Sequence, residues 1–327
     1  MRFALFRLVA GFVVASLVSP LTSSAAPKIG VLLKGHSAFW SAVEKGAVEA
    51  GAQLGVDVIV KSPLAESDVS VQIQLLNALG AAGIDALVIA PCSTDALAAP
   101  AAALAAKGVK VVVIDTELAG KASHVFVGTD QQAAGEAAGR LLATLVSEKD
   151  EVSFLKHSQT SGATALREAG ALTVLREAHP KVVVHGDIYA SAEKDAEPQK
   201  ANLLLTTYPA TKAILASGTP GTMAMLHTLE QNKLAGAIKL VGFGFNLNPE
   251  VATAIEQGAL EGWVAQLPKD VGAKGVASAL ALIKGETVAP VVHTDFIAIT
   301  KSNLPDPQVQ ALLALRGALR APLRVDR

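Results

Sequence analysis

Short runs of valine, isoleucine and leucine alternate along this chain with longer, alanine-rich segments. Five such runs come first, at Ile29–Leu33, Val56–Val60, Ala86–Ile89, Val109–Ile114 and Val125–Val127. Five more follow at Glu151–Leu155, Val182–Ile188, Ala213–Ala216, Ile238–Phe243 and Gly262–Gln266. Apolar strands of this kind between amphipathic helices are typical of parallel sheets covered by helices on both faces. The pattern therefore predicts an α/β fold of two similar three-layer lobes, each with about five strands.

The segments between the strands predict helices, among them Ala42–Leu54, Ser67–Ala82, Thr94–Ala106, Gln131–Ser147 and Val271–Lys284. We expect the chain to pass between the lobes near Gly128–Asp130, after Gln266–Pro268 and near His293–Asp295, ahead of a last strand at Phe296–Ile299. The predicted lobes are 27–130 plus 268–293 and 131–267 plus 294–303, and a tail spans 304–327. A hinge crossed several times favours closure of one lobe on the other over independent, tethered domains.

Residues 1–26 have the pattern of a secretory signal peptide. Arg2 and Arg7 precede an apolar core at Leu8–Val18, and small residues lead to a cleavage site after Ala25. The pattern predicts export and cleavage, and we expect a protein of the bacterial periplasm.

Composition excludes several classes of function. The formal net charge of −1 offers no basic field for nucleic acid. Cys92 is the only cysteine, so an intramolecular disulfide is excluded. Outside the leader, the sequence contains no uncharged apolar run long enough to span a membrane.

Motifs for catalysis, cofactors and metals are missing from the sequence. We find no G-x-S-x-G elbow, no H-E-x-x-H and no phosphate loop, and the seven histidines lack zinc-ligand spacing. Gly242-Phe243-Gly244 lacks the third glycine of a dinucleotide fingerprint. Cys92 fits a small buried hydrophobic residue better than a nucleophile. We therefore expect a binding protein without enzymatic activity, cofactor or metal.

Polar and aromatic residues gather instead after the predicted strands, where an open α/β sheet binds its ligands. The candidates are Ser37, Phe39, Trp40, Asp115, Thr116, Arg167, Gly218, Gly244 and Gln266. Phe39 and Trp40 stand out because aromatic residues make up only 4% of the chain. Together these residues suit a polyhydroxylated ligand, since aromatic faces cover the C–H side of a sugar and charged groups bond its hydroxyls.

The main candidates also have structural interpretations. Phe39 and Trp40 could be core residues at the start of a helix, and Asp115 could cap a following segment. Arg167 lies beside Glu168 and could be an ion-paired surface residue. Gln266 could satisfy backbone groups at the hinge. His36 and His157 also follow predicted strands, where a structural or solvent-facing role is the simpler interpretation.

The sequence resembles the periplasmic sugar-binding proteins of ABC importers, the ribose-binding-protein-like group of type I periplasmic binding proteins. The resemblance covers about residues 28–300. It is strongest in SAFWSAVEKGA, ESDVSVQIQLLNALGAAGIDALVIAPCSTDAL, KVVVIDTELAG, FVGTDQQAAGEAAG and VAQLPKDVGAKGVASALALIKGE. It implies the type I fold, a permease partner and a monomer.

The resemblance also implies individual roles. Phe39 and Trp40 match the ring-stacking pair, Asp115 the acid of the first lobe, Arg167 the arginine of the second lobe and Gln266 the hinge-side glutamine. Ribose binders carry other residues at four positions, where this chain has Ser37, Thr116, Gly218 and Gly244. Because glycine leaves space, we expect a larger or less hydroxylated ligand than ribose, such as a sugar derivative or polyol.

Two uses of such a protein remain open at the level of sequence. The first is delivery of a captured sugar-like solute to an ABC permease after hinge closure. The second is sensing, in which the closed form docks on a chemoreceptor or histidine kinase. An exported enzyme on this fold is disfavoured by the missing catalytic motifs. A transcription-repressor core is disfavoured by the leader and by the absence of a helix-turn-helix segment.

Overall fold

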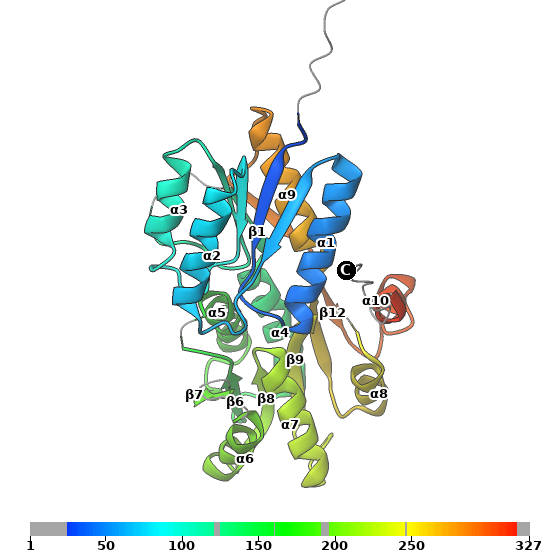
Figure 1. Ribbon diagram of the computed structural model, residues 1–327. Helices are drawn as coiled ribbons and strands as arrows, with labels where there is room; N and C mark the ends of the chain where they lie inside the picture. The colour runs from blue at the N-terminus through cyan, green and yellow to red at the C-terminus, as the bar shows by residue number, and fades with distance from the viewer. Residues whose placement is uncertain (1–24, 121–124, 160, 191–195, 246, 319–327) are drawn as a thin grey trace, which may run out of the picture.

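The computed structural model of the protein describes residues 25–120, 125–159, 161–190, 196–245 and 247–318. Nearly all of the predicted leader and the end of the predicted tail lie outside these residues. The described chain forms two lobes, one above the other in Figure 1, with several segments passing between them.

The first lobe is built on a parallel sheet of six described strands, in the order β11-β5-β4-β3-β1-β2. The strands are β1 (Lys28–Leu32), β2 (Asp57–Lys61), β3 (Ala86–Ile89), β4 (Lys110–Ile114), β5 (Val125–Thr129) and β11 (Val291–Thr294). One face packs against α1 (Ala38–Leu54) and α9 (Pro268–Ile283), and the other against α2 (Val69–Ala81) and α3 (Ala98–Ala105).

The second lobe contains a sheet of six described strands in the order β12-β10-β9-β8-β6-β7. The strands are β6 (Glu151–Lys156), β7 (Val183–Tyr189), β8 (Thr211–Ala216), β9 (Lys239–Phe245), β10 (Gly262–Gln266) and β12 (Phe296–Ile299). One face packs against α4 (Gln131–Leu145) and α5 (Gly162–Ala178). The other carries α7 (Thr219–Gln231), with α6 (Glu197–Thr207), α8 (Pro249–Gln257) and α10 (Pro307–Ala318) around it.

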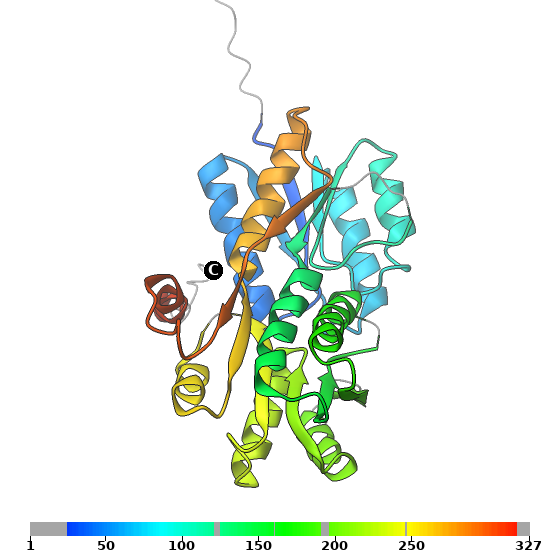
Figure 2. The same cartoon turned by 180° about the vertical axis from the view of Figure 1, so that it is seen from behind.

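The predicted fold class is confirmed, since both sheets are covered by helices on two faces. The strand β11 was not predicted, because it is a four-residue edge strand containing a histidine, and Val291 is 45% exposed. Only Asp295 separates β11 from β12, and Figure 2 shows this segment running directly from one lobe to the other. It is parallel to β5 in the first sheet and antiparallel to β10 in the second, because the carboxyl ends of the two sheets face each other.

Three connections pass between the sheets, at β5–α4, β10–α9 and β11–β12. Two of them are joined by a hydrogen bond between the buried hydroxyls of Thr129 and Thr294, whose oxygens lie 3.2 Å apart. The connecting segments thus form a hinge beside the cleft between the lobes.

Two details of helix packing position the site. The first helix begins at Ala38, four residues before the predicted start, because Ser37 caps it and accepts a hydrogen bond from the Trp40 amide at 3.4 Å. Phe39 and Trp40 therefore lie in the first helical turn. In the second lobe, a Cβ atom on Gly135 of α4 would overlap the backbone of Arg167 on α5. Glycine there lets the two helices approach closely.

Within the described residues, no helix combines the length and the hydropathy needed to cross a membrane.

Candidate ligand-binding cleft

A cavity of about 370 Å³ lies between the lobes and is lined by residues of both. From the first lobe it is lined by Lys34, Ser37, Phe39, Trp40, Glu66 and Asp115. From the second lobe and the hinge it is lined by His157, Arg167, Gly218, Phe245 and Gln266, among others. It lies at the facing carboxyl ends of the two sheets, where the sequence predicted a ligand site.

Three aromatic rings form a row along this cavity. Phe39 packs edge-to-face on Trp40, with ring centroids 4.9 Å apart, and on Phe245 of the opposite lobe at 5.4 Å. The Trp40 indole N–H donates a hydrogen bond to Glu66 Oε1 at 2.6 Å. Trp40 is 2% exposed and belongs to the core of the first lobe as well. The core interpretation is therefore correct for Trp40, and the same residue also lines the cavity, where its contact with a ligand stays a prediction.

Asp115 is held beside a lysine that the sequence prediction missed. The ammonium of Lys34 donates to Asp115 Oδ2 and to Thr116 Oγ1, each at 2.7 Å, and Thr116 Oγ1 donates to Asp115 Oδ2 at 2.9 Å. Burial raises the pKa of Asp115, but the charge and hydrogen bond of Lys34 outweigh burial and hold that pKa below its ordinary value. Asp115 also has a left-handed backbone with φ of 65°, so it does not adopt the extended conformation of a helix N-cap.

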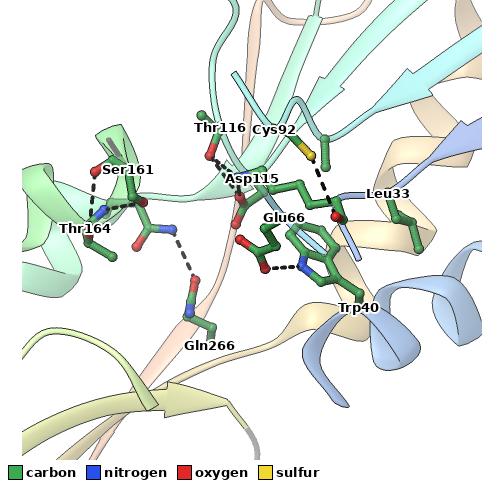
Figure 3. A network of polar contacts seen from close by, with 12 residues as sticks. Leu33, Trp40, Glu66, Cys92, Asp115, Thr116, Ser161, Thr164 and Gln266 are labelled. Carbon is green, nitrogen blue, oxygen red and sulfur yellow. Dashed lines mark hydrogen bonds and ion pairs between the residues drawn. The ribbon is translucent and has the colours of Figure 1, made fainter. Parts of the chain in front are cut away.

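Arg167 is fixed by a chain of side-chain hydrogen bonds that reaches the hinge. Its Nε donates to Gln131 Oε1 at 2.6 Å and its Nη1 to the Ser217 carbonyl at 2.9 Å, while the guanidinium lies over Phe243. Gln131 Nε2 in turn donates to Gln266 Oε1 at 3.1 Å, and Figure 3 marks this bond by the dashed line that ends on the labelled Gln266. Arg167 is 5% exposed, and burial lowers its pKa to about 10, which leaves it charged at neutral pH.

These contacts decide two structural alternatives. Arg167 is buried, so the alternative of a surface arginine is wrong. Gln266 accepts a hydrogen bond from the Gln131 side chain, and no hydrogen bond to the hinge backbone is found for it among the described residues.

His157 closes one side of the cavity as a neutral group. Burial, together with the charges of Arg167 and Lys34, lowers its pKa to about 4. A Cβ atom on Gly218 would lie 2.9 Å from His157 Nδ1. The space left by Gly218 is therefore shared with the histidine ring.

Seven of the nine predicted residues line the cavity, and two do not. Thr116 is buried behind Asp115 and bonds Lys34. Gly244 is wrong as a source of ligand space, because a Cβ atom there would overlap the indole of Trp263. Trp263 is 1% exposed and fills the volume that the glycine leaves.

Four residues that line the cavity or bond its side chains were missed or given no role: Lys34, Glu66, Gln131 and Phe245. Lys34 and Phe245 end or follow strands of the sheets, and this position was the available signal. Glu66 and Gln131 gave no local signal, because their partners lie 26 and 36 residues away in the chain.

Cys92 lies in the loop after β3, and its thiol contacts the Lys34 carbonyl at 3.6 Å. Burial raises its pKa to about 12. A thiol with such a pKa is a poor nucleophile, but Cys92 is half-buried rather than the buried hydrophobic residue that was predicted.

Comparison with known proteins identifies the family. The family model described as periplasmic binding protein domain matches residues 29–287. The D-allose-binding periplasmic protein of Escherichia coli is 28% identical over 82% of this chain and 88% of its own length. The ribose import binding protein RbsB of the same organism is 24% identical over 81% of this chain and 88% of its own length.

Solved structures agree with this assignment. A carbohydrate transporter solute-binding protein from Agrobacterium radiobacter, in complex with D-arabinose, has a TM-score of 0.81 and 30% identity, covering 89% of this chain and all of that one. The periplasmic component of an ABC-type sugar transport system from Hahella chejuensis has a TM-score of 0.77 and 31% identity, covering 84% of this chain and all of that one. The chain therefore belongs to the periplasmic binding protein domain family.

Proposed function

We propose that this protein captures a neutral sugar or polyol between its lobes and delivers it to the permease of an ABC importer. The observation that carries the proposal is the cavity itself, in which a row of aromatic rings lies beside a buried acid, an arginine and an amide. The solved relatives include solute-binding proteins with D-arabinose and D-fucose bound.

The polar side chains still have hydrogen-bonding capacity for a ligand. Among the described residues, no partner is found for Asp115 Oδ1, Glu66 Oε2, Arg167 Nη2 or Gln266 Nε2. Two acceptors and two donors around one cavity match the hydroxyls of a sugar, each of which donates one hydrogen bond and accepts others. The aromatic row would cover the C–H face of the same ring.

The balance of charge favours a neutral ligand. The cavity is lined by two cations, Lys34 and Arg167, and two anions, Glu66 and Asp115, while His157 is neutral above its lowered pKa. A sugar acid would bring a net charge into a site that has none to compensate it. An unpaired charge in such an enclosed place is costly.

Closure of the lobes about the hinge completes the proposed mechanism. We assign residues 27–130 and 268–293 to one lobe, and 131–267 and 294–303 to the other. Gln131 follows the β5–α4 connection and Gln266 precedes the β10–α9 connection. The hydrogen bonds of Gln131 to Arg167 and Gln266 therefore join the Arg167 side chain, which faces the cavity, to both connections. A ligand held by Asp115 on one side and Arg167 on the other would stabilise the closed arrangement.

Residues 1–26 act in this proposal as the leader that exports the protein to the periplasm, where the D-allose-binding relative belongs by its name. The mature protein would work as a monomer, since one chain supplies both walls of the cavity.

A thermal-shift screen with neutral sugars, polyols and sugar acids tests the proposal. A ligand at 100 times its Kd stabilises the native state by about 2.7 kcal/mol, which gives a clear rise in Tm. We expect neutral sugars or polyols to raise Tm. If sugar acids alone raise it, the charge argument is wrong, and if no carbohydrate raises it, the ligand class is wrong.

A further inference from the structure

The aromatic row is not confined to one lobe. Phe245, the last residue of β9, reaches Phe39 across the cavity, and their rings meet edge-to-face at an interplanar angle of 81°. Both residues line the cavity and are half-buried. A ligand in the cavity would therefore meet one continuous apolar surface at this point, built by a ring from each lobe.

The packing behind β9 explains why a polar side chain is missing there. Gly244 precedes Phe245, and the indole of Trp263 occupies the place where a side chain at 244 would begin. Trp263 lies on the adjacent strand β10 and is fully enclosed in the core of the second lobe. Within the described part of β9, Phe245 is thus the residue that lines the cavity.

We infer that Phe245 is a specificity-determining residue that selects a ligand with an unhydroxylated edge, such as the methyl group of a 6-deoxy sugar. The inference rests on the proposed function and narrows its ligand class. The polar side chains Asp115, Arg167 and Gln266 bind the hydroxylated part of this ligand. The joint surface of Phe39 and Phe245 covers its C–H edge.

The physical basis is the cost of burying a hydroxyl without a partner. Ring edges and faces offer no acceptor comparable to a carboxylate, so a hydroxyl packed against the surface of Phe39 and Phe245 loses its hydrogen bonds to water without replacement. A methyl group at the same place loses nothing and buries apolar surface. When a ligand carries a polar group that finds no partner in the site, its affinity falls by about tenfold or more relative to the ligand without that group.

Isothermal titration calorimetry tests the inference by comparing the Kd values of matched sugar pairs. The probes are D-galactose with D-fucose, D-glucose with 6-deoxy-D-glucose, and D-allose with 6-deoxy-D-allose. In the wild-type protein we expect the deoxy member to bind at least about tenfold tighter than its parent in the pair that binds best. Phe245→Asn should reduce this ratio to about threefold or less, because the amide can bond the extra hydroxyl.

Two further variants serve as matched controls. Phe245→Leu keeps this part of the cavity wall apolar and should preserve the ratio of deoxy-sugar to parent-sugar affinity. Tyr208→Asn removes a half-buried ring that stacks on His185 and does not line the cavity, so it should leave the ratio unchanged. The wild-type ratio decides the question even where a variant fails to fold.

The outcomes separate this inference from the proposed function. If sugars bind but the hydroxylated parent binds as tightly as the deoxy sugar in every pair, the inference is overturned and the proposed function stands. A ratio that survives Phe245→Asn also overturns it. If neither member of any pair binds, and no other sugar does, both proposals fall.

Discussion

Replacing Lys34 by methionine tests whether the ion pair with Asp115 organises the cleft. The lysine ammonium lies 2.7 Å from Asp115 Oδ2, and the two side chains are only 10% and 13% exposed. Lys34→Met keeps the aliphatic length but leaves the carboxylate without its main partner. Thr116 and the more distant charge of Arg167 remain.

The expected cost follows from this geometry. Removing one member of a buried ion pair costs about 3–5 kcal/mol, because the other charge stays buried without compensation. The remaining hydroxyl and the charge of Arg167 reduce that cost, so we expect the free energy of unfolding to fall by about 3 kcal/mol at pH 7.

The pH dependence gives a second signature. In the wild type the pKa of Asp115 is lowered, so its stabilisation is present above the unfolded pKa of about 3.9 and is lost as pH falls through the folded value. In the variant, burial acts without Lys34, and the pKa of Asp115 rises above its ordinary range. The carboxyl group of the variant then takes up its proton at a higher pH. The difference in the free energy of unfolding between wild type and variant should therefore shrink as pH falls from 7 towards 4.

Differential scanning calorimetry at several pH values measures both effects. Lys45→Met is the matched control, because the ion pair of Lys45 with Glu49 is 3.9 Å long and partly exposed. Such a pair contributes about 0.3–0.5 kcal/mol. The reasoning would be refuted if Lys34→Met lowered the free energy of unfolding at pH 7 by less than about 1 kcal/mol. It would also be refuted if the difference in that free energy between wild type and variant did not change with pH.

Three further predictions concern the site and its frame. Asparagine tolerates the left-handed backbone of residue 115 as aspartate does. Asp115→Asn should nevertheless weaken sugar binding at least tenfold in titration calorimetry, since hydrogen bonds to a charged group contribute about 1.5–3 kcal/mol. Unchanged affinity would contradict the role of Asp115. Gly46→Ala should lower the free energy of unfolding by about 3 kcal/mol, because its Cβ would overlap the backbone of α9. In Gly162→Ala the new methyl group meets open space, so this variant should raise the free energy of unfolding by about 0.4–1 kcal/mol. Equal effects of Gly46→Ala and Gly162→Ala on Tm would refute the packing argument. His157 has a folded pKa near 4, below its unfolded value, so it should make stability rise with pH between about 4 and 6.5, and an NMR titration midpoint at 6 or above would count against its burial.

The strands were predictable because their apolar runs are buried on both faces, as at β3 and β4. The carboxyl ends of these strands then indicated where Asp115 and the aromatic pair would lie. The edge strand β11 gave a weaker signal, since it is short and half-exposed. The other edge strands of the described sheets, β2, β7 and β12, were predicted, so the missing signal at β11 is its short, interrupted apolar run rather than its place at an edge.

The missed parts of the site depend on contacts between distant segments. A lone lysine at the end of a strand is normally solvated, and only its distance to Asp115, 81 residues away, shows that Lys34 is part of the site. The role of Gly244 likewise depends on β10, which places the Trp263 ring against it. Sequence alone showed that a side chain was missing at 244, and the structure showed what fills the space.

A crystal structure of the protein with the neutral sugar that raises Tm most would test the central claim most directly. We expect density for the sugar in the cavity between the lobes, with hydroxyls bonded to Asp115 and Arg167 and the C–H face on Trp40. Density for that sugar at another place, or a ligand bound without contact to either lobe's polar groups, would contradict the account.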